Sequence, residues 1–111
     1  MVYMRIFISM PMKSKGIGQV RVEMNEIFEK IKQNFWSAAT NIELIDSIVE
    51  GADTDIASKG DGASLWYLGE AIKRMADAHI IFFVGDWQNY RGCRIERAAA
   101  EAYGKYCVDL K

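Results

Sequence analysis

The sequence predicts an α/β fold in which a parallel sheet of about four strands lies between two layers of helices. Three observations predict it. Strand-like and helix-like segments alternate along the whole chain, a pattern typical of parallel sheets joined by right-handed helical crossovers. Residues 79–84 are apolar at almost every position, as in strands covered on both faces. The length of 111 residues suits one domain, residues 1–111, without a second.

Residues 2–9 combine apolar, β-branched and aromatic side chains and predict the first strand. Residues 10–18 form a loop that holds the chain's single proline. A helix of about four turns is predicted next, because apolar residues recur at helical spacing. These residues are Val20, Met24, Ile27, Phe28, Ile31 and Phe35. Residues 42–49 predict the second strand, although two polar residues, Asp46 and Ser47, interrupt it.

Residues 50–62 contain three glycines, three aspartates and no apolar periodicity, which predicts a loop without regular structure. Loops of this length in a small domain are often lids or binding loops. A second helix follows, with Ser64 as its expected N-cap. Its apolar stripe is Leu65, Leu68, Ile72 and Met75, and we expect Gly69 to permit close helix packing.

The remaining elements are a third strand at 79–84, a third helix and a short final strand at 106–110. Gly104 is the expected end of the third helix, because glycine accepts the left-handed conformation of a helix C-terminus. The apolar positions of this helix are Ile95, Ala98, Ala99 and Ala102. The whole pattern predicts a doubly wound, flavodoxin-like or Rossmann-like sheet with the strand order 2-1-3-4.

In such sheets, ligands bind at the carboxyl ends of the strands where the strand order reverses. The residues there are 9–12, 85–88 and 90–92, the last at the start of the third helix. Glu96 is the acidic residue in the first turns of that helix, and we expect the helix N-terminus to favour its ionised form. An ionised and oriented glutamate can attack a sugar carbon and form a covalent glycosyl-enzyme. Glu96 is therefore the candidate catalytic residue, although a glutamate in a helix is more often a solvated surface residue.

Composition excludes several classes of partner. The chain has 14 basic and 15 acidic residues, a formal net charge of −1 and no basic stripe, which argues against a nucleic-acid polymer. Its short apolar start resembles neither a signal peptide nor a membrane span, so we expect a cytoplasmic protein. The two cysteines and one histidine do not form a zinc pattern. We expect free thiols, a structural role for His79, no metal and no cofactor.

Three segments resemble a known family. They are residues 4–12 (MRIFISMPM), residues 65–69 (LWYLG) with 75–78 (MADA), and residues 85–96 (GDWQNYRGCRIE) with Ala100, Tyr103 and Gly104 beyond them. The chain resembles the small nucleoside 2-deoxyribosyltransferase-like proteins of bacteria and phages. This resemblance implies that Glu96 attacks C1′ of a deoxyribonucleoside or its 5′-monophosphate and releases the base. The sugar then passes to another base (a transferase) or to water (a hydrolase).

The chain departs from the family pattern at two positions. Tyr90 stands where the relatives carry Asp or Ser, six residues before the glutamate, and Trp66 stands where the transferases carry a base-handling Asp. An aromatic ring at either position can stack on a base. Because both carboxylates are lost, a non-catalytic nucleotide-binding or sensing module is the alternative function. A structural oligomer without a ligand is the third hypothesis.

The expected ligand contacts combine position and chemistry. Arg91 suits a phosphate or carboxylate, although it is equally explained as a surface charge, and Trp66 as a packing aromatic. Lys13 and Lys15 are weaker candidates for phosphate. The full set of expected contacts is Ser9, Met10, Trp66, Asp86, Trp87, Tyr90, Arg91 and Gly92. The small core and the family resemblance also predict a homo-oligomer.

Overall fold

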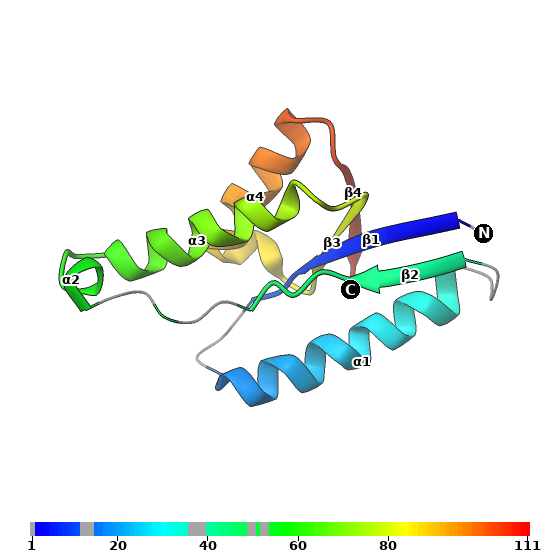
Figure 1. The fold of residues 1–111 in the computed structure, drawn as a ribbon, viewed down its shortest axis with the longest axis horizontal. Helices are drawn as coiled ribbons and strands as arrows, with labels where there is room; N and C mark the ends of the chain where they lie inside the picture. Colours follow the sequence, from blue (N-terminus) through cyan, green and yellow to red (C-terminus); the bar gives the residue numbers. More distant parts are fainter. Residues whose placement is uncertain (1, 12–14, 36–39, 49–50, 52–53) are drawn as a thin grey trace.

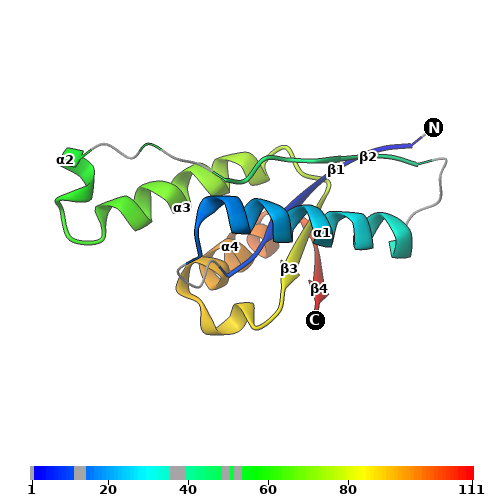
Figure 2. The same cartoon turned by 90° about the horizontal axis from the view of Figure 1, so that it is seen from below.

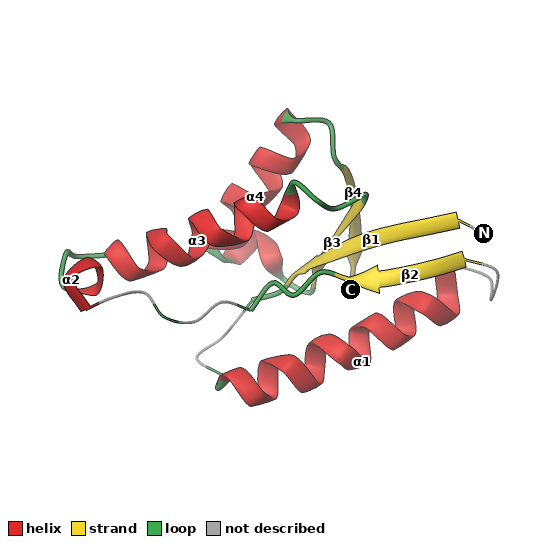
Figure 3. Ribbon diagram, in the orientation of Figure 1, coloured by secondary structure: helices red, strands yellow, loops and turns green. Residues whose placement is uncertain are grey.

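A computed structural model describes residues 2–11, 15–35, 40–48, 51 and 54–111 of the chain. Figure 1 shows the arrangement of the elements and Figure 3 distinguishes helices from strands. The strands are β1 (Val2–Ser9), β2 (Thr40–Leu44), β3 (Ile80–Val84) and β4 (Tyr106–Leu110). The helices are α1 (Ile17–Phe35), α2 (Thr54–Ala57), α3 (Gly62–Met75), the short 3-10 helix η1 (Trp87–Asn89) and α4 (Arg91–Ala102).

The four strands form one parallel sheet with the order β2-β1-β3-β4, which confirms the predicted order. In the central strand β1, Ile6 is in register with Leu44 of β2 on one side and with Ile80 of β3 on the other. The chain leaves β1 through α1 and leaves β3 through α4, and the two helices cover opposite faces of the sheet. The carboxyl ends of β1 and β3 therefore form the point where the strand order reverses.

Alternation along the strands sends neighbouring side chains into two separate cores. On the face covered by α1, the buried core side chains are Ile6, Ile8, Val20, Met24, Ile31 and Phe82. On the face covered by α3 and α4, they are Phe7, Ile45, Met75, Ala78, Ile81, Phe83 and Ala100. Figure 1 shows α1 on one side of the strands and α3 with α4 on the other, and Figure 2, seen from below, shows α1 in front of β1. The predicted three-layer α/β/α architecture is confirmed.

The second strand ends at Leu44, before residue 49, the end expected from the sequence. Its ladder ends where the Ile45 N–H donates to the Ile6 carbonyl at 2.9 Å. The Asp46 carboxylate then accepts the N–H of Ile48 at 3.1 Å, a local bond that competes with strand pairing. Residue 49 lies outside the described residues. The polar residues that interrupt the apolar pattern thus mark where the chain leaves the sheet.

The segment 50–62 is not free of regular structure, because α2 forms one helical turn within it. The Ser58 N–H donates to the Thr54 carbonyl at 3.0 Å, and the Lys59 ammonium pairs with the Asp55 carboxylate at 3.2 Å. Residues 50, 52 and 53 lie outside the described residues. A single turn carries too few residues to show apolar periodicity, which is why the sequence did not reveal it.

The start of α3 also differs from expectation. Asp61, not Ser64, occupies the N-cap position, and its side chain makes no capping hydrogen bond. At Gly62 a Cβ atom would meet the Ile56 carbonyl oxygen at 2.1 Å, so the α2–α3 turn requires a glycine there. Gly69 does not serve close packing, because in the described part of the chain no heavy atom outside its own helix and its neighbours lies within 4 Å of its Cβ position.

The end of α4 follows the prediction. Gly104 has a φ of +73°, the left-handed conformation that favours glycine. Its N–H donates to the Glu101 carbonyl at 3.2 Å, and the Lys105 N–H donates to the Ala100 carbonyl at 2.9 Å. This pair of bonds is the Schellman motif, which satisfies the last carbonyls of a helix. The chain then enters β4 directly.

The outer part of α3 extends beyond the sheet. Met75 at its end is buried in the core, whereas Leu65, the first residue of the predicted apolar stripe, is 69% exposed. Figure 1 shows α2 and the start of α3 as the part of the molecule farthest from the strands. We call residues 54–68 the arm. Within the described residues, no helix is long and apolar enough to cross a membrane.

Candidate functional site

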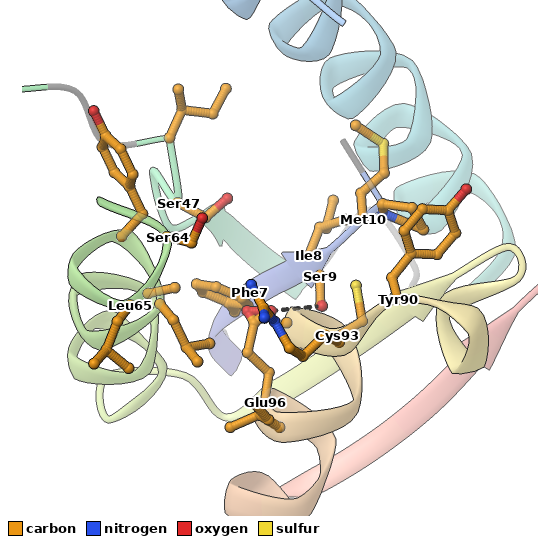
Figure 4. A pocket seen from close by; sticks show the side chains of 18 of the residues that line it. Phe7, Ile8, Ser9, Met10, Ser47, Ser64, Leu65, Tyr90, Cys93 and Glu96 are labelled. Atoms are coloured by element: carbon orange, nitrogen blue, oxygen red, sulfur yellow. Dashed lines mark hydrogen bonds between the residues drawn. The ribbon is translucent and has the colours of Figure 1, made fainter. Parts of the chain in front are cut away.

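A pocket of about 970 Å³ opens at the carboxyl ends of the strands, beside the end of β1. The start of α1, the arm and the first turns of α4 form its walls (Figure 4). Most of the lining is apolar, including Phe7, Ile8, Met10, Pro11, Ile17, Met24, Ile48, Leu65, Leu68, Ala71 and Ile95. A concave apolar site with a few polar groups is the usual form of a small-molecule site. The pocket lies where the doubly wound topology predicts one.

Glu96 is the central polar group of this pocket. It lies on the buried face of α4 and is 8% exposed. The Ser9 hydroxyl donates a hydrogen bond of 2.9 Å to Glu96 Oε1, and Figure 4 shows the two side chains meeting at the end of β1. Ser9 is itself 2% exposed. It reaches Glu96 because Phe7 and Ser9 project from β1 towards the face that α4 covers.

The environment of Glu96 favours the protonated carboxyl, contrary to the sequence expectation. Burial raises its pKa to about 7, and the hydrogen bond from Ser9 opposes this shift. The start of α4 lies too far from Glu96 to offset this burial. α4 begins at Arg91, so Glu96 lies beyond its first turn, where the effect of the helix dipole has already declined. Desolvation therefore determines the direction of the shift.

Cys93, like Asp61, lines the pocket although the sequence did not single it out. It lies one helical turn before Glu96, lines the pocket and is 6% exposed. Burial raises the pKa of its thiol, and the neighbouring Ser9 hydroxyl opposes the shift. A thiol with a raised pKa is a weak nucleophile at neutral pH, so Cys93 contributes to the packing of the pocket floor. The i, i+3 spacing from Glu96 was the signal for it.

The pocket gathers most of the residues expected from the sequence. Those that line it are Ser9, Met10, Tyr90, Arg91, Gly92 and Glu96. They come from the end of β1 and the start of α4, two segments more than 80 residues apart along the chain, as the Ser9–Glu96 separation of 87 shows. Whether they contact a ligand stays a prediction.

Trp87 is placed outside the lining of this pocket. Its ring packs against Phe83 at 5.4 Å between centroids, and its indole N–H donates to the Asp109 carboxylate at 3.1 Å. The Arg97 guanidinium lies 5.0 Å from the centroids of both rings and also pairs with Asp109 at 2.7 Å. This cluster ties η1, α4 and β4 together. Its position gives Trp87 a packing role.

Two further expected contacts also lie outside the lining. Trp66 packs edge-on against Tyr67, with 5.1 Å between ring centroids, and only Tyr67 lines the pocket. Asp86 lines a second pocket of about 270 Å³. Lys15 lines that second pocket too and pairs with Glu23 at 2.6 Å, while Lys13 lies outside the described residues. His79 has the expected structural role, because its Nδ1 accepts the Arg5 N–H at 2.8 Å.

An ion pair spans the rim of the large pocket. Arg91, the first residue of α4, contacts the Asp61 carboxylate at 3.0 Å, and both side chains are exposed. This contact joins the arm to the start of α4. No group of three or more histidine, cysteine or acidic side chains that could hold a metal occurs among the described residues. Both cysteines are free.

Comparisons with family models, curated proteins and solved structures find no match to this chain. The family resemblance therefore rests on the sequence segments given above. The site rests on its own geometry: a buried carboxylate, a hydroxyl that fixes it, and an apolar pocket at the switch point of the sheet.

Proposed function

We propose that the protein cleaves the N-glycosidic bond of a nucleoside or nucleoside 5′-monophosphate, with Glu96 as the nucleophile. One observation carries the proposal: the Glu96 carboxylate is held by Ser9 at 2.9 Å in the wall of a large apolar pocket. An oriented carboxylate in a site that excludes water is what displacement at a sugar carbon requires. The resemblance to the deoxyribosyltransferase-like proteins supports the same assignment.

The proposed reaction has two displacements. Ser9 holds Oε1, so the attack falls to Oε2, which forms a bond to C1′ of the sugar. The C1′–N bond breaks, its electron pair leaves with the base, and the base takes up a proton from solvent water. In the second step, water or another base attacks C1′, gives up a proton to solvent, and the C1′–Oε2 bond breaks to release the carboxylate. Water gives hydrolysis and a base gives transfer.

The pocket walls supply contacts for a nucleoside. Tyr90 presents an aromatic ring on which a base can stack. The Ser9 and Met10 backbone and the start of α4 at Arg91 and Gly92 lie at the same end of the pocket, where polar groups are needed for the sugar and its 5′ substituent. No cofactor enters this reaction, because the substrate and the carboxylate supply all of its electrons.

A non-catalytic nucleotide-binding or sensing module is the second candidate, and one observation favours it. Burial raises the pKa of Glu96 to about 7, so a large fraction of the carboxyl is protonated at neutral pH and serves as a hydrogen-bond donor. Asp61 is the only other carboxylate lining the large pocket in the described residues, and it is bound to Arg91. Among the residues that the structure describes, Glu96 therefore has no second carboxylate in the pocket that is free to assist it.

The proposal also includes assembly and location. Leu65 and Ile95, 69% and 42% exposed, lie at the pocket and would be covered by a second copy of the chain. Both cysteines are free, as a reducing compartment keeps them. We therefore place the proposed reaction in the cytoplasm and assign it to a homo-oligomer.

The test is release of free base from a panel of nucleosides and 5′-monophosphates, followed by chromatography. Glu96→Gln keeps the size of the side chain but removes the attacking charge. Base release should fall by about two to three orders of magnitude. Glu29→Gln, an exposed change on α1, is the matched control.

Mass spectrometry of the quenched reaction gives a second readout, because a trapped sugar should map to the peptide that contains Glu96. Full activity in Glu96→Gln would remove Glu96 from the mechanism. Binding without any turnover in the wild type would instead establish the second candidate.

A further inference from the structure

Both positively charged side chains that line the large pocket in the described residues form ion pairs with carboxylates of the protein. In the described part of the chain, four charged side chains line this pocket, namely Lys59, Asp61, Arg91 and Glu96. Arg91 contacts Asp61 at 3.0 Å, and Lys59 contacts Asp55 at 3.2 Å. Each of the two cations therefore has a carboxylate partner in the arm, Asp55 for Lys59 and Asp61 for Arg91.

Glu96 has a neutral partner instead of a cation. Burial raises its pKa and the hydrogen bond from Ser9 lowers it, and no lysine or arginine of the described residues is among the causes of the shift. Among the described residues, a ligand anion placed near Glu96 would therefore meet a desolvated carboxyl group without a paired cation. A neutral ligand avoids this cost.

The Arg91–Asp61 ion pair is one in which a ligand anion could take the place of Asp61 as the partner of Arg91. Arg91 begins α4, whereas Asp61 stands at the N-cap position of α3 and uses its carboxylate for Arg91, not for capping. The two side chains are 62% and 75% exposed, and exposed pairs of this kind contribute little to stability. The Asp61 carboxylate nevertheless occupies one Nη of Arg91 and offsets its charge, so an anionic ligand must compete with Asp61 for the guanidinium.

We propose that Asp61 is a specificity-determining residue: by holding the Arg91 guanidinium, it withholds the cation at the pocket rim from anionic ligands. The pocket then takes neutral ligands in preference to anionic ones. Within the proposed function, on which this part of the inference rests, the site favours nucleosides over their 5′-monophosphates. The charge preference itself does not depend on whether Glu96 is a catalyst.

The first test uses inorganic phosphate as the anion and the full chain as it exists. NMR follows the Nε–Hε signal of Arg91 during the titration. Asp61→Asn should bind phosphate at Arg91 at least about fivefold more tightly than the wild type. In the variant, phosphate forms its charge-assisted hydrogen bond with Arg91 without displacing a carboxylate. Asp61→Glu, which keeps the carboxylate, should behave as the wild type.

Two variants isolate the cause. Asp77→Asn makes the same change in net charge at an exposed ion pair with Arg5 outside the lining of the pocket, and should leave phosphate binding unchanged. The double variant Asp61→Asn with Arg91→Gln should lose the gain entirely. The gain should also decline at roughly 0.5 M salt, because exposed charges are screened.

The second test compares dissociation constants for thymidine and 2′-deoxyadenosine with those of their 5′-monophosphates. The ratio should move towards the monophosphates in Asp61→Asn by at least about fivefold. An unchanged Arg91 signal and an unchanged ratio in Asp61→Asn would overturn the inference, even where nucleosides bind. If phosphate behaves as expected and no nucleoside or nucleotide binds, the proposed function fails while the role of Asp61 stands on the phosphate result.

Discussion

Glu96 is an acidic residue held among apolar side chains, and its burial couples the stability of the fold to pH. The residue is 8% exposed, and the Ser9 hydroxyl donates a hydrogen bond to its carboxylate. One hydrogen bond does not replace the hydration of a charged carboxylate. Burial therefore raises its pKa from 4.5 to about 7. Such a group is costly to the fold, as functional groups often are.

The first prediction concerns Glu96→Gln and the free energy of unfolding. A raised pKa means that the folded state binds the proton more tightly than the unfolded state. Stability from Glu96 is therefore complete below its unfolded pKa of 4.5 and is lost as pH rises through about 7. The full loss is roughly 3 kcal/mol, from 1.4 kcal/mol for each unit of pKa.

Glu96→Gln removes this loss, so the variant should be more stable than the wild type at pH 8 and similar to it at pH 4. Urea unfolding at both pH values measures the difference, with Glu29→Gln as the exposed control. A variant that is less stable than the wild type at pH 8 would show that the ionised Glu96 carboxylate does not lower the free energy of unfolding.

The second prediction concerns Ser9. Its hydrogen bond lowers the pKa of Glu96, so Ser9→Ala should move that pKa above about 7. Base release should rise with pH through the pKa of the nucleophile, because only the ionised carboxylate attacks. In Ser9→Ala this rise should move to higher pH, and turnover should fall by about tenfold.

NMR titration of the Glu96 carboxyl measures the pKa directly and does not depend on turnover. Ser58→Ala is a suitable control, because the Ser58 hydroxyl bonds the Asp55 carbonyl and lies outside the pocket lining. An unchanged pKa in Ser9→Ala would separate Ser9 from the electrostatics of the site.

At the scale of the elements, the turn between α2 and α3 determines how α2 packs against the start of α3. Gly62 approaches the Ile56 carbonyl so closely that a Cβ atom would stand 2.1 Å from its oxygen. Gly69, seven residues later in the same helix, has open space at that position in the described part of the chain. The two glycines therefore predict opposite effects of the same substitution.

The third prediction compares Gly62→Ala with Gly69→Ala. The first should disrupt the turn, because the clash is with backbone and cannot be relieved by moving a side chain. The second should raise stability by about 0.5–1 kcal/mol, the helix preference of alanine over glycine. Thermal unfolding measures both effects, and hydrogen exchange of residues 54–61 should speed up only in Gly62→Ala. Equal effects of the two changes would contradict this assignment of Gly62.

At the scale of the whole molecule, the arm leaves apolar surface uncovered. The chain measures 47 × 30 × 24 Å, and Figure 1 shows the arm as the part that extends away from the sheet. Leu65 in the arm and Ile95 on α4 are large exposed apolar residues, and both line the large pocket. Exposed apolar side chains that lie together favour contact with another protein surface.

The fourth prediction is that the chain is at least a dimer. Light scattering at micromolar concentration should give a mass of at least twice 12.6 kDa. The double variant Leu65→Ser with Ile95→Ser should lower the mass towards that of one chain, whereas Tyr106→Ser, an exposed change on β4, should not. A wild-type mass of one chain would contradict the assembly.

The sequence alone determined the architecture of this protein. Apolar spacing identifies β1, α1, β3 and α4, because burial of one helix face or of a whole strand leaves a periodic pattern. The strand order β2-β1-β3-β4 follows from short right-handed crossovers, which allow few arrangements. The same rules place Glu96 at the switch point. Single-turn α2 left no such pattern, whereas Asp46 and Ser47 interrupt the apolar pattern just beyond the end of β2.

Only the tertiary structure decided the chemistry of the site. Ser9 and Glu96 are 87 residues apart along the chain, and Asp61 and Arg91 are 30 apart. Their contacts depend on the register between separate elements, which residue types do not specify. The depth of burial that raises the pKa of Glu96, and the packing that turns Trp87 towards Phe83 and Asp109, arise in the same way. Periodicity determines which face a residue occupies, whereas packing determines what it meets there.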